Sequence, residues 1–130
     1  MQIQEPEYHS SVTLLVLGEE LKADTVSDLL KLEPDKSWQQ DDKHEWGGWK
    51  KMASETEGLE LPQQLEHWLS LLHSRCDALG ALASLGLYIA LDCFITPKEE
   101  GGGTASIQLP PELIEAIGSL GVELRLSFLS

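Results

Sequence analysis

Three tryptophans lie within twelve positions of this chain, with acidic side chains and a histidine between them. The tryptophans are Trp38, Trp46 and Trp49, and the intervening loop carries Asp41, Asp42, His44 and Glu45. Indole rings bury a large area at little cost in side-chain entropy, and carboxylates pair with the Lys or Arg side chains of a partner. The cluster therefore predicts a surface that binds a basic protein partner.

A structural interpretation of the same tryptophans stays open beside this one. Trp38 and Trp49 can face each other across a hairpin and cover an open end of the hydrophobic core. Large rings are seldom left exposed in a small domain, so this interpretation is favoured for these two residues and less so for Trp46. The two interpretations are compatible, because a ring can close the core and still present an edge to a partner.

The polar side chains of this loop are also of the types that ligate divalent metal ions. Their spacing matches no known metal-binding loop, and the glycine and bidentate glutamate positions of a calcium-binding EF-hand are missing. We therefore expect a solvated acidic turn, and we expect neither a metal nor a cofactor.

One helical segment offers His73, Cys76 and Asp77, which are the residue types of a nucleophile, a base and an orienting acid. Side chains on one helix rarely converge on a substrate as a catalytic triad does. Cys76 follows the apolar stripe of the helix, so we expect it to be a small buried hydrophobe like Cys93. Motifs of serine hydrolases, dinucleotide-binding proteins and phosphate-binding loops are absent from the sequence. The sequence therefore predicts a protein that is not an enzyme.

Charge and length narrow the class of protein further. The 22 acidic and 9 basic residues give a formal net charge of -13, which argues against binding to nucleic acids and to anionic membranes. A chain of 130 residues with 42% hydrophobic residues fits a single α+β domain spanning residues 1–130. Residues 1–7 lack the basic region and apolar run of a signal peptide, so we expect a cytoplasmic protein.

Hydrophobic patterning predicts eight elements in the order βαββαβαβ. The strands cover residues 8–17, 36–40, 48–54, 87–95 and 122–128, and the helices cover residues 25–31, 59–85 and 110–119. This order predicts a two-layer α+β sandwich, with a mostly antiparallel sheet, helices on one face and a ferredoxin-like core in the first six elements.

Three finer expectations concern single residues of these elements. Gly80 is expected to bend the long central helix or end its first segment. Leu126 and Phe128 are expected to point inward from the last strand, which alternates cleanly between apolar and polar residues. Asp92, the one carboxylate in an apolar strand, is open to two interpretations: it can be half-buried, or, as is more often the case, it faces solvent or pairs across the sheet with Arg125.

Several short motifs of the chain, taken together, resemble a known family. They are the opening strand at residues 12–17, the phrase Leu-Lys-Leu-Glu-Pro-Asp-Lys-Ser-Trp at residues 30–38, the step Gly47-Gly48-Trp49, and the helix start Pro110-Pro111-Glu112-Leu113. The chain resembles the bacterial family called domain of unknown function 4279 over nearly its whole length. This resemblance implies small bacterial proteins encoded near toxins, some of which act as immunity proteins, and it implies no catalytic residues.

The sequence therefore predicts a non-enzymatic binding protein, specifically a bacterial immunity protein that neutralises a basic toxin, such as a nuclease, by occluding it. Its partner-binding residues would be those of the tryptophan loop. One alternative is a module that senses a small ligand or a peptide, with a pocket lined by Tyr88, Phe94 and the tryptophans. A second alternative is an enzyme with an unfamiliar active site. The sequence leaves the oligomeric state open.

Overall fold

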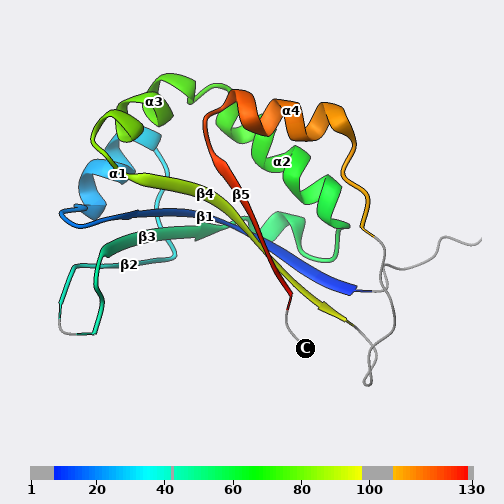
Figure 1. Cartoon of the computed structure of the whole chain (residues 1–130), viewed down its shortest axis with the longest axis horizontal. Coiled ribbons are helices and arrows are strands. Elements are labelled where there is room, and N and C mark those ends of the chain that lie inside the picture. The colour runs from blue at the N-terminus through cyan, green and yellow to red at the C-terminus, as the bar shows by residue number, and fades with distance from the viewer. Residues whose placement is uncertain (1–7, 42, 98–106, 129–130) are drawn as a thin grey trace, which may run out of the picture.

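A five-stranded open sheet with helices on one face forms the part of the chain that the computed structural model describes, residues 8–41, 43–97 and 107–128 (Figure 1). The strands are β1 (Tyr8–Gly18), β2 (Lys36–Trp38), β3 (Gly47–Met52), β4 (Tyr88–Pro97) and β5 (Glu123–Phe128). The helices are α1 (Ala23–Leu30), α2 (Leu61–His73), α3 (Cys76–Ser84) and α4 (Pro111–Ser119), with a short 3-10 turn at Ser54–Thr56. In these ranges no helix has both the length and the apolar character needed to cross a membrane.

The strands follow one another across the sheet in the order β2-β3-β1-β4-β5. β1 is the central strand and runs antiparallel to both β3 and β4, while β2 runs antiparallel to β3. Only β4 and β5 are parallel, as expected for strands joined by a connection that contains a helix. The predicted α+β class, with a mostly antiparallel sheet and helices on one face, is confirmed.

One face of the sheet builds the core with the helices. Val12, Leu14 and Val16 alternate along β1 and are buried, and β4 contributes a matching row. Trp68 of α2 packs on this face with no solvent exposure, and its indole Nε1 donates a hydrogen bond to the Val12 carbonyl at 3.3 Å. The apolar stripe predicted for the central helix therefore covers the central strand.

The other face of the sheet has no described helix packed on it, and we call it the open face (Figure 1). Residues paired across neighbouring strands share a face, so the register defines its side chains. Leu17 of β1 lies between Gly48 of β3 and Tyr88 of β4, and Leu15 lies between Lys50 and Ala90. Aromatic and charged groups thus stand on a sheet surface that the helices leave uncovered.

The long helix predicted over residues 59–85 is instead two helices, α2 and α3, and the break lies at Ser74 and Arg75 rather than at Gly80. Arg75 donates from Nε to the Leu30 carbonyl at 2.7 Å and from Nη1 to the Leu71 carbonyl at 2.6 Å. The first bond ties the junction to the end of α1, and the second ties it to the last turn of α2. The break takes Cys76 off the apolar stripe, and the prediction that Cys76 is buried is wrong.

The last strand is less buried than its alternating pattern predicts. Leu126 is 44% exposed and Phe128 is 68% exposed, although Leu126 shares a register position with the buried Cys93. β5 is an edge strand with one neighbour, and its C-terminal half runs away from α4 (Figure 1). Residues at this end therefore face the core side of the sheet without a helix to cover them.

Candidate functional site

The tryptophan loop begins with Trp38, whose indole lies on the backbone of Gly48. The two residues are register partners, so Trp38 stands on the open face. A Cβ atom added at Gly48 would lie 2.0 Å from Cζ2 of Trp38, which means that only glycine leaves room for the ring. The indole Nε1 of Trp38 donates a hydrogen bond to the Trp46 carbonyl at 3.1 Å. Trp38 therefore ties the two ends of the loop together.

Trp49 points to the opposite face of the sheet. Its side chain has no solvent exposure, and its Nε1 donates to the Ser27 hydroxyl at 3.0 Å. The core interpretation of Trp49 is confirmed, but the predicted facing of Trp38 and Trp49 is wrong. The register pairs Trp38 with Gly48, and a shift of one residue moves a strand side chain to the other face. A partner that binds the loop meets no part of the Trp49 ring.

The acidic turn is held by its own carboxylate. Asp41 Oδ1 accepts hydrogen bonds from the backbone N–H groups of Lys43 and His44 at 2.8 Å each, and it lies 3.1 Å from His44 Nδ1. These two backbone donors, followed by the His44 ring, hold the pKa of Asp41 below its usual value. Asp42 lies outside the described residues. Glu45 is exposed, so the turn presents charge while Asp41 shapes it.

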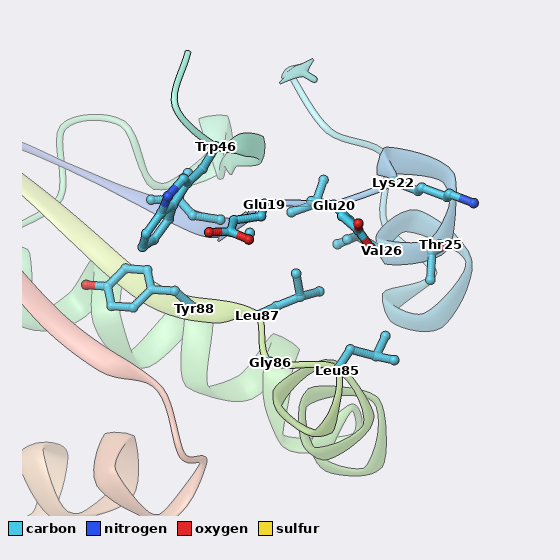
Figure 2. A pocket seen from close by; sticks show the side chains of 13 residues that line it. Glu19, Glu20, Lys22, Thr25, Val26, Trp46, Leu85, Gly86, Leu87 and Tyr88 are labelled. Atoms are coloured by element: carbon cyan, nitrogen blue, oxygen red, sulfur yellow. The ribbon is translucent and has the colours of Figure 1, made fainter. Parts of the chain in front are cut away.

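A second group of residues meets the loop at the end of the open face. Gly18 pairs with Gly47 at the last position of the β1–β3 ladder. Just beyond this pair, Glu19 follows β1 and Trp46 precedes β3. Tyr88 begins β4 on the other side of β1. Figure 2 shows the Glu19 carboxylate projecting toward the space between the Trp46 and Tyr88 rings. Trp46 is 42% exposed, so its ring is within reach of a partner.

These residues line a cleft of about 710 Å³ at this end of the sheet. Its walls come from the turn after β1, the start of α1, the loop before β3 and the loop before β4, and they include Glu19, Glu20, Trp46, Leu85, Leu87 and Tyr88. The Tyr88 hydroxyl donates to the Glu123 carboxylate on β5, which fixes the Tyr88 ring. We call this the Trp46 cleft.

Sequence patterns found only part of this cleft. Trp46 was a candidate, and Tyr88 belonged to the alternative pocket, but Phe94 does not line the cleft. Glu19 was missed, although an acidic pair directly after a strand and its closing glycine was a usable signal. The pairing of β1 with β3 brings Glu19 to Trp46, and the pairing of β1 with β4, which are far apart in the sequence, brings it to Tyr88.

A second cavity, of about 610 Å³, lies at the other end of β1, between β3, the 3-10 turn and α2. Its buried Gln64 donates from Nε2 to the Ser10 hydroxyl at 2.8 Å and to the Leu59 carbonyl at 2.7 Å. Near it, His67 Nε2 lies 2.9 Å from Glu55 Oε1. The Gln64 bonds therefore hold α2 on β1, and the contact of His67 with Glu55 joins α2 to the 3-10 turn.

The helical residues that resembled a catalytic set do not form one. Cys76 is exposed, and its thiol bonds to the backbone carbonyl of His73 at 3.0 Å rather than to the imidazole. Burial, together with the nearby Asp92 charge, raises the pKa of the Cys93 thiol to about 12, so this group stays protonated. Among the described residues, no three His, Cys, Asp or Glu side chains are placed to hold a metal ion.

Asp92 is buried on the open face, which corrects the expectation that it faces solvent. It shares register positions with Thr13 of β1 and Arg125 of β5. Its side chain is 7% exposed, and its Oδ1 has no hydrogen-bond partner in the described ranges. The predicted alignment with Arg125 is present, but no ion pair joins the two side chains in the part of the chain described.

Comparison with protein families gave a match over nearly the whole chain. A family model described as Domain of unknown function (DUF4279) matches residues 6–129, which is nearly the whole chain. Searches of the curated proteins and of the solved structures found no match.

Proposed function

We propose that the protein, which belongs to the family described as Domain of unknown function (DUF4279), is a non-enzymatic binding protein for a basic protein partner. Specifically, it would act as an immunity protein that neutralises a basic toxin by occluding the toxin's working surface. The Trp46 cleft and the turn around Asp41 would form the contact surface.

One observation carries this proposal: Trp46 is exposed beside a cleft in which Glu19 and Glu20 lie among mostly apolar side chains. Tryptophan is among the residue types most enriched at the positions that dominate binding energy, so the exposed Trp46 ring can serve as an anchor for a partner. The bond from Trp38 to the Trp46 carbonyl holds the loop in place before binding, which lowers the entropy cost of association.

The charge distribution supports a basic partner at this end of the molecule. Glu19 and Glu20 lie in the cleft walls beside Lys22, and Asp41 and Glu45 lie on the neighbouring turn beside Lys43, so these acidic side chains outnumber the basic ones. The rest of the open face carries Lys36, Lys50 and Arg125 beside Asp92 and Glu123. Acidic groups around an aromatic anchor speed the encounter with a cationic protein, and the anchor then slows its release.

The test uses the product of the gene that adjoins the gene for this chain, purified in an inactive form. We expect calorimetric titration to give tight binding that weakens as salt rises. Trp46→Ala should weaken binding at least about a hundredfold, as expected for a dominant anchor. Phe128→Ala is the matched control, because Phe128 is an exposed aromatic at the other end of the sheet. Equal losses for both variants would place the contact surface elsewhere.

A growth assay tests the biological role separately. Co-expression of this chain with the active neighbouring protein should restore growth, and the Trp46→Ala variant should restore it less. If the neighbouring protein is not toxic, or if this chain neither binds it nor restores growth, the immunity role is excluded.

A second candidate function is the binding of a small ligand. The volume of the Trp46 cleft lies within the range of about 300–1,000 Å³ that small-molecule sites occupy. A ligand that binds the native state raises the melting temperature, so a thermal-shift screen with metabolites tests this function. A flat response across the screen, together with binding of the basic protein, would favour the first proposal.

We also propose that the first four strands and the helices between them form a ferredoxin-like core to which α4 and β5 are added. The order β2-β3-β1-β4, with every neighbouring pair antiparallel, supports this classification.

A further inference from the structure

We propose that the Trp46 cleft binds one cationic side chain of the partner, a lysine ammonium or an arginine guanidinium, between the rings of Trp46 and Tyr88. This inference names the group that the proposed binding function recognises and therefore rests on that function. It follows from the position of one carboxylate and two aromatic rings at the end of the sheet.

Three strands bring these groups together from distant parts of the sequence. Glu19 follows the central strand β1. Trp46 directly precedes β3 and Tyr88 begins β4, and these two strands are the neighbours of β1 in the sheet. The carboxylate projects toward the space between the rings (Figure 2). A positive group placed there would meet the carboxylate on one side and an aromatic ring on either flank.

This set of groups is selective for cations. An aromatic ring attracts a cation to its face, tryptophan most strongly, and a nearby carboxylate adds charge attraction. The Tyr88 hydroxyl donates to Glu123, which increases the electron density of the Tyr88 ring and holds it in one orientation. An anionic ligand would be repelled by Glu19 and would gain nothing from the ring faces.

The cleft also suits the hydrocarbon stem of a basic side chain. Leu87 lines it next to Tyr88, and the exposed Leu85 lies farther along the cleft, away from the aromatic pair (Figure 2). Lysine and arginine bury their methylene groups against apolar surface while the charged end reaches a polar group. Lys22 is the basic residue among those that line the cleft, and its ammonium group points away from the rings (Figure 2).

The binding experiment uses small probes and needs no partner. The full chain is titrated with N-acetyl-lysine amide, N-acetyl-arginine amide and the neutral N-acetyl-norleucine amide. The readout is the indole N–H signal in NMR that disappears in the Trp46→Phe variant. We expect saturable shifts of this signal with one or both cations and none with the norleucine derivative. The tighter of the two cationic probes identifies the preferred group.

Variants separate a local site from the overall negative charge. Glu19→Gln and Trp46→Leu should each weaken binding of the cationic probe about tenfold. Glu115→Gln on α4 removes the same charge far from the cleft and should leave binding within about twofold. Equal weakening by Glu19→Gln and Glu115→Gln, or equal binding of the norleucine derivative, would overturn the inference.

Failure of this inference and failure of the proposed function are distinguishable. If the basic protein binds but neither cationic probe shifts the Trp46 signal, the cleft is not a cation site and the binding function stands. If the probes bind but the basic protein does not, the cation site stands and the immunity role falls.

Discussion

The indole ring of Trp38 occupies the space above Gly48 where any other residue would place a side chain. A Cβ atom at Gly48 would come within 2.0 Å of the ring, well inside contact distance. Through its Nε1, the same ring holds the carbonyl of Trp46, whose side chain stands at the mouth of the cleft. Because Gly48 has no side chain, the Trp38 ring can lie on β3 and hold the backbone of Trp46 in position.

We expect Gly48→Ala to lower the free energy of unfolding by about 1–3 kcal/mol, because the added methyl group displaces the Trp38 ring from the sheet. Urea unfolding measures this change. Gly80→Ala is the control, since a Cβ atom there meets nothing within 4 Å and alanine favours a helix, so it should raise the free energy of unfolding by up to about 1 kcal/mol. If the two variants change stability alike, steric contact with Trp38 does not explain Gly48.

Replacement of Trp46 and of Trp49 by alanine should lower the free energy of unfolding by very different amounts. Trp49→Ala should lower the free energy of unfolding by about 3–5 kcal/mol, because its ring is fully buried and its N–H bonds to Ser27. Trp46→Ala should change it by less than about 1 kcal/mol, because that ring is exposed. Denaturant unfolding of both variants measures the difference. A large loss of stability in Trp46→Ala would mean that the ring serves the fold rather than a partner.

The sequence predicted the layered fold because apolar residues repeat at helix and strand spacings along most elements. It failed at the tryptophan hairpin, where β2 has only three residues and carries too little pattern to define its register. With Trp38 opposite Gly48 instead of Trp49, one indole lies on the open face and the other in the core. A one-residue difference in the β2–β3 register therefore places Trp38 and Trp49 on opposite faces of the sheet, although the sequence pattern predicted that they face each other.

The cleft could be predicted only in part for a different reason. Trp46 could be predicted as a binding residue from its residue type, whereas Glu19 is one of many acidic residues and lies in a turn. Its significance depends on the pairing of β1 with β4, which the sequence alone did not define. The helix break at Arg75 is similar, because Arg75 bonds there to the distant Leu30 carbonyl. Contacts between distant segments, rather than local patterns, account for these differences.

The two cysteines should differ sharply in reactivity toward a thiol reagent at pH 8. Cys76 is exposed and should react in the native protein. Cys93 is buried, and its pKa of about 12 leaves almost no thiolate, so it should react only after unfolding. Mass spectrometry after iodoacetamide treatment, with and without denaturant, distinguishes the sites, and Cys76→Ser should abolish native labelling. Native labelling of Cys93 would show that the sheet opens locally.

The acidic turn should make its own contribution to the dependence of folding on pH. The backbone N–H groups of Lys43 and His44, with the His44 ring, lower the pKa of Asp41 in the folded state. A lowered folded pKa stabilises the fold above the unfolded value of about 3.9, and this stabilisation is lost as pH falls through the folded value. We therefore expect Asp41→Asn to lose less stability than the parent between about pH 4 and pH 2.

Asp77→Asn, which removes an exposed charge from α3, controls for the change in net charge. Unfolding followed across this pH range measures stability, and NMR titration of the Asp41 carboxyl measures its pKa directly. The Trp46 indole signal should shift together with Asp41 protonation, because the turn leads directly into the loop that carries Trp46. A parallel pH dependence for the parent and Asp41→Asn, or an Asp41 pKa at its ordinary value, would mean that the turn is not held by the charged carboxylate.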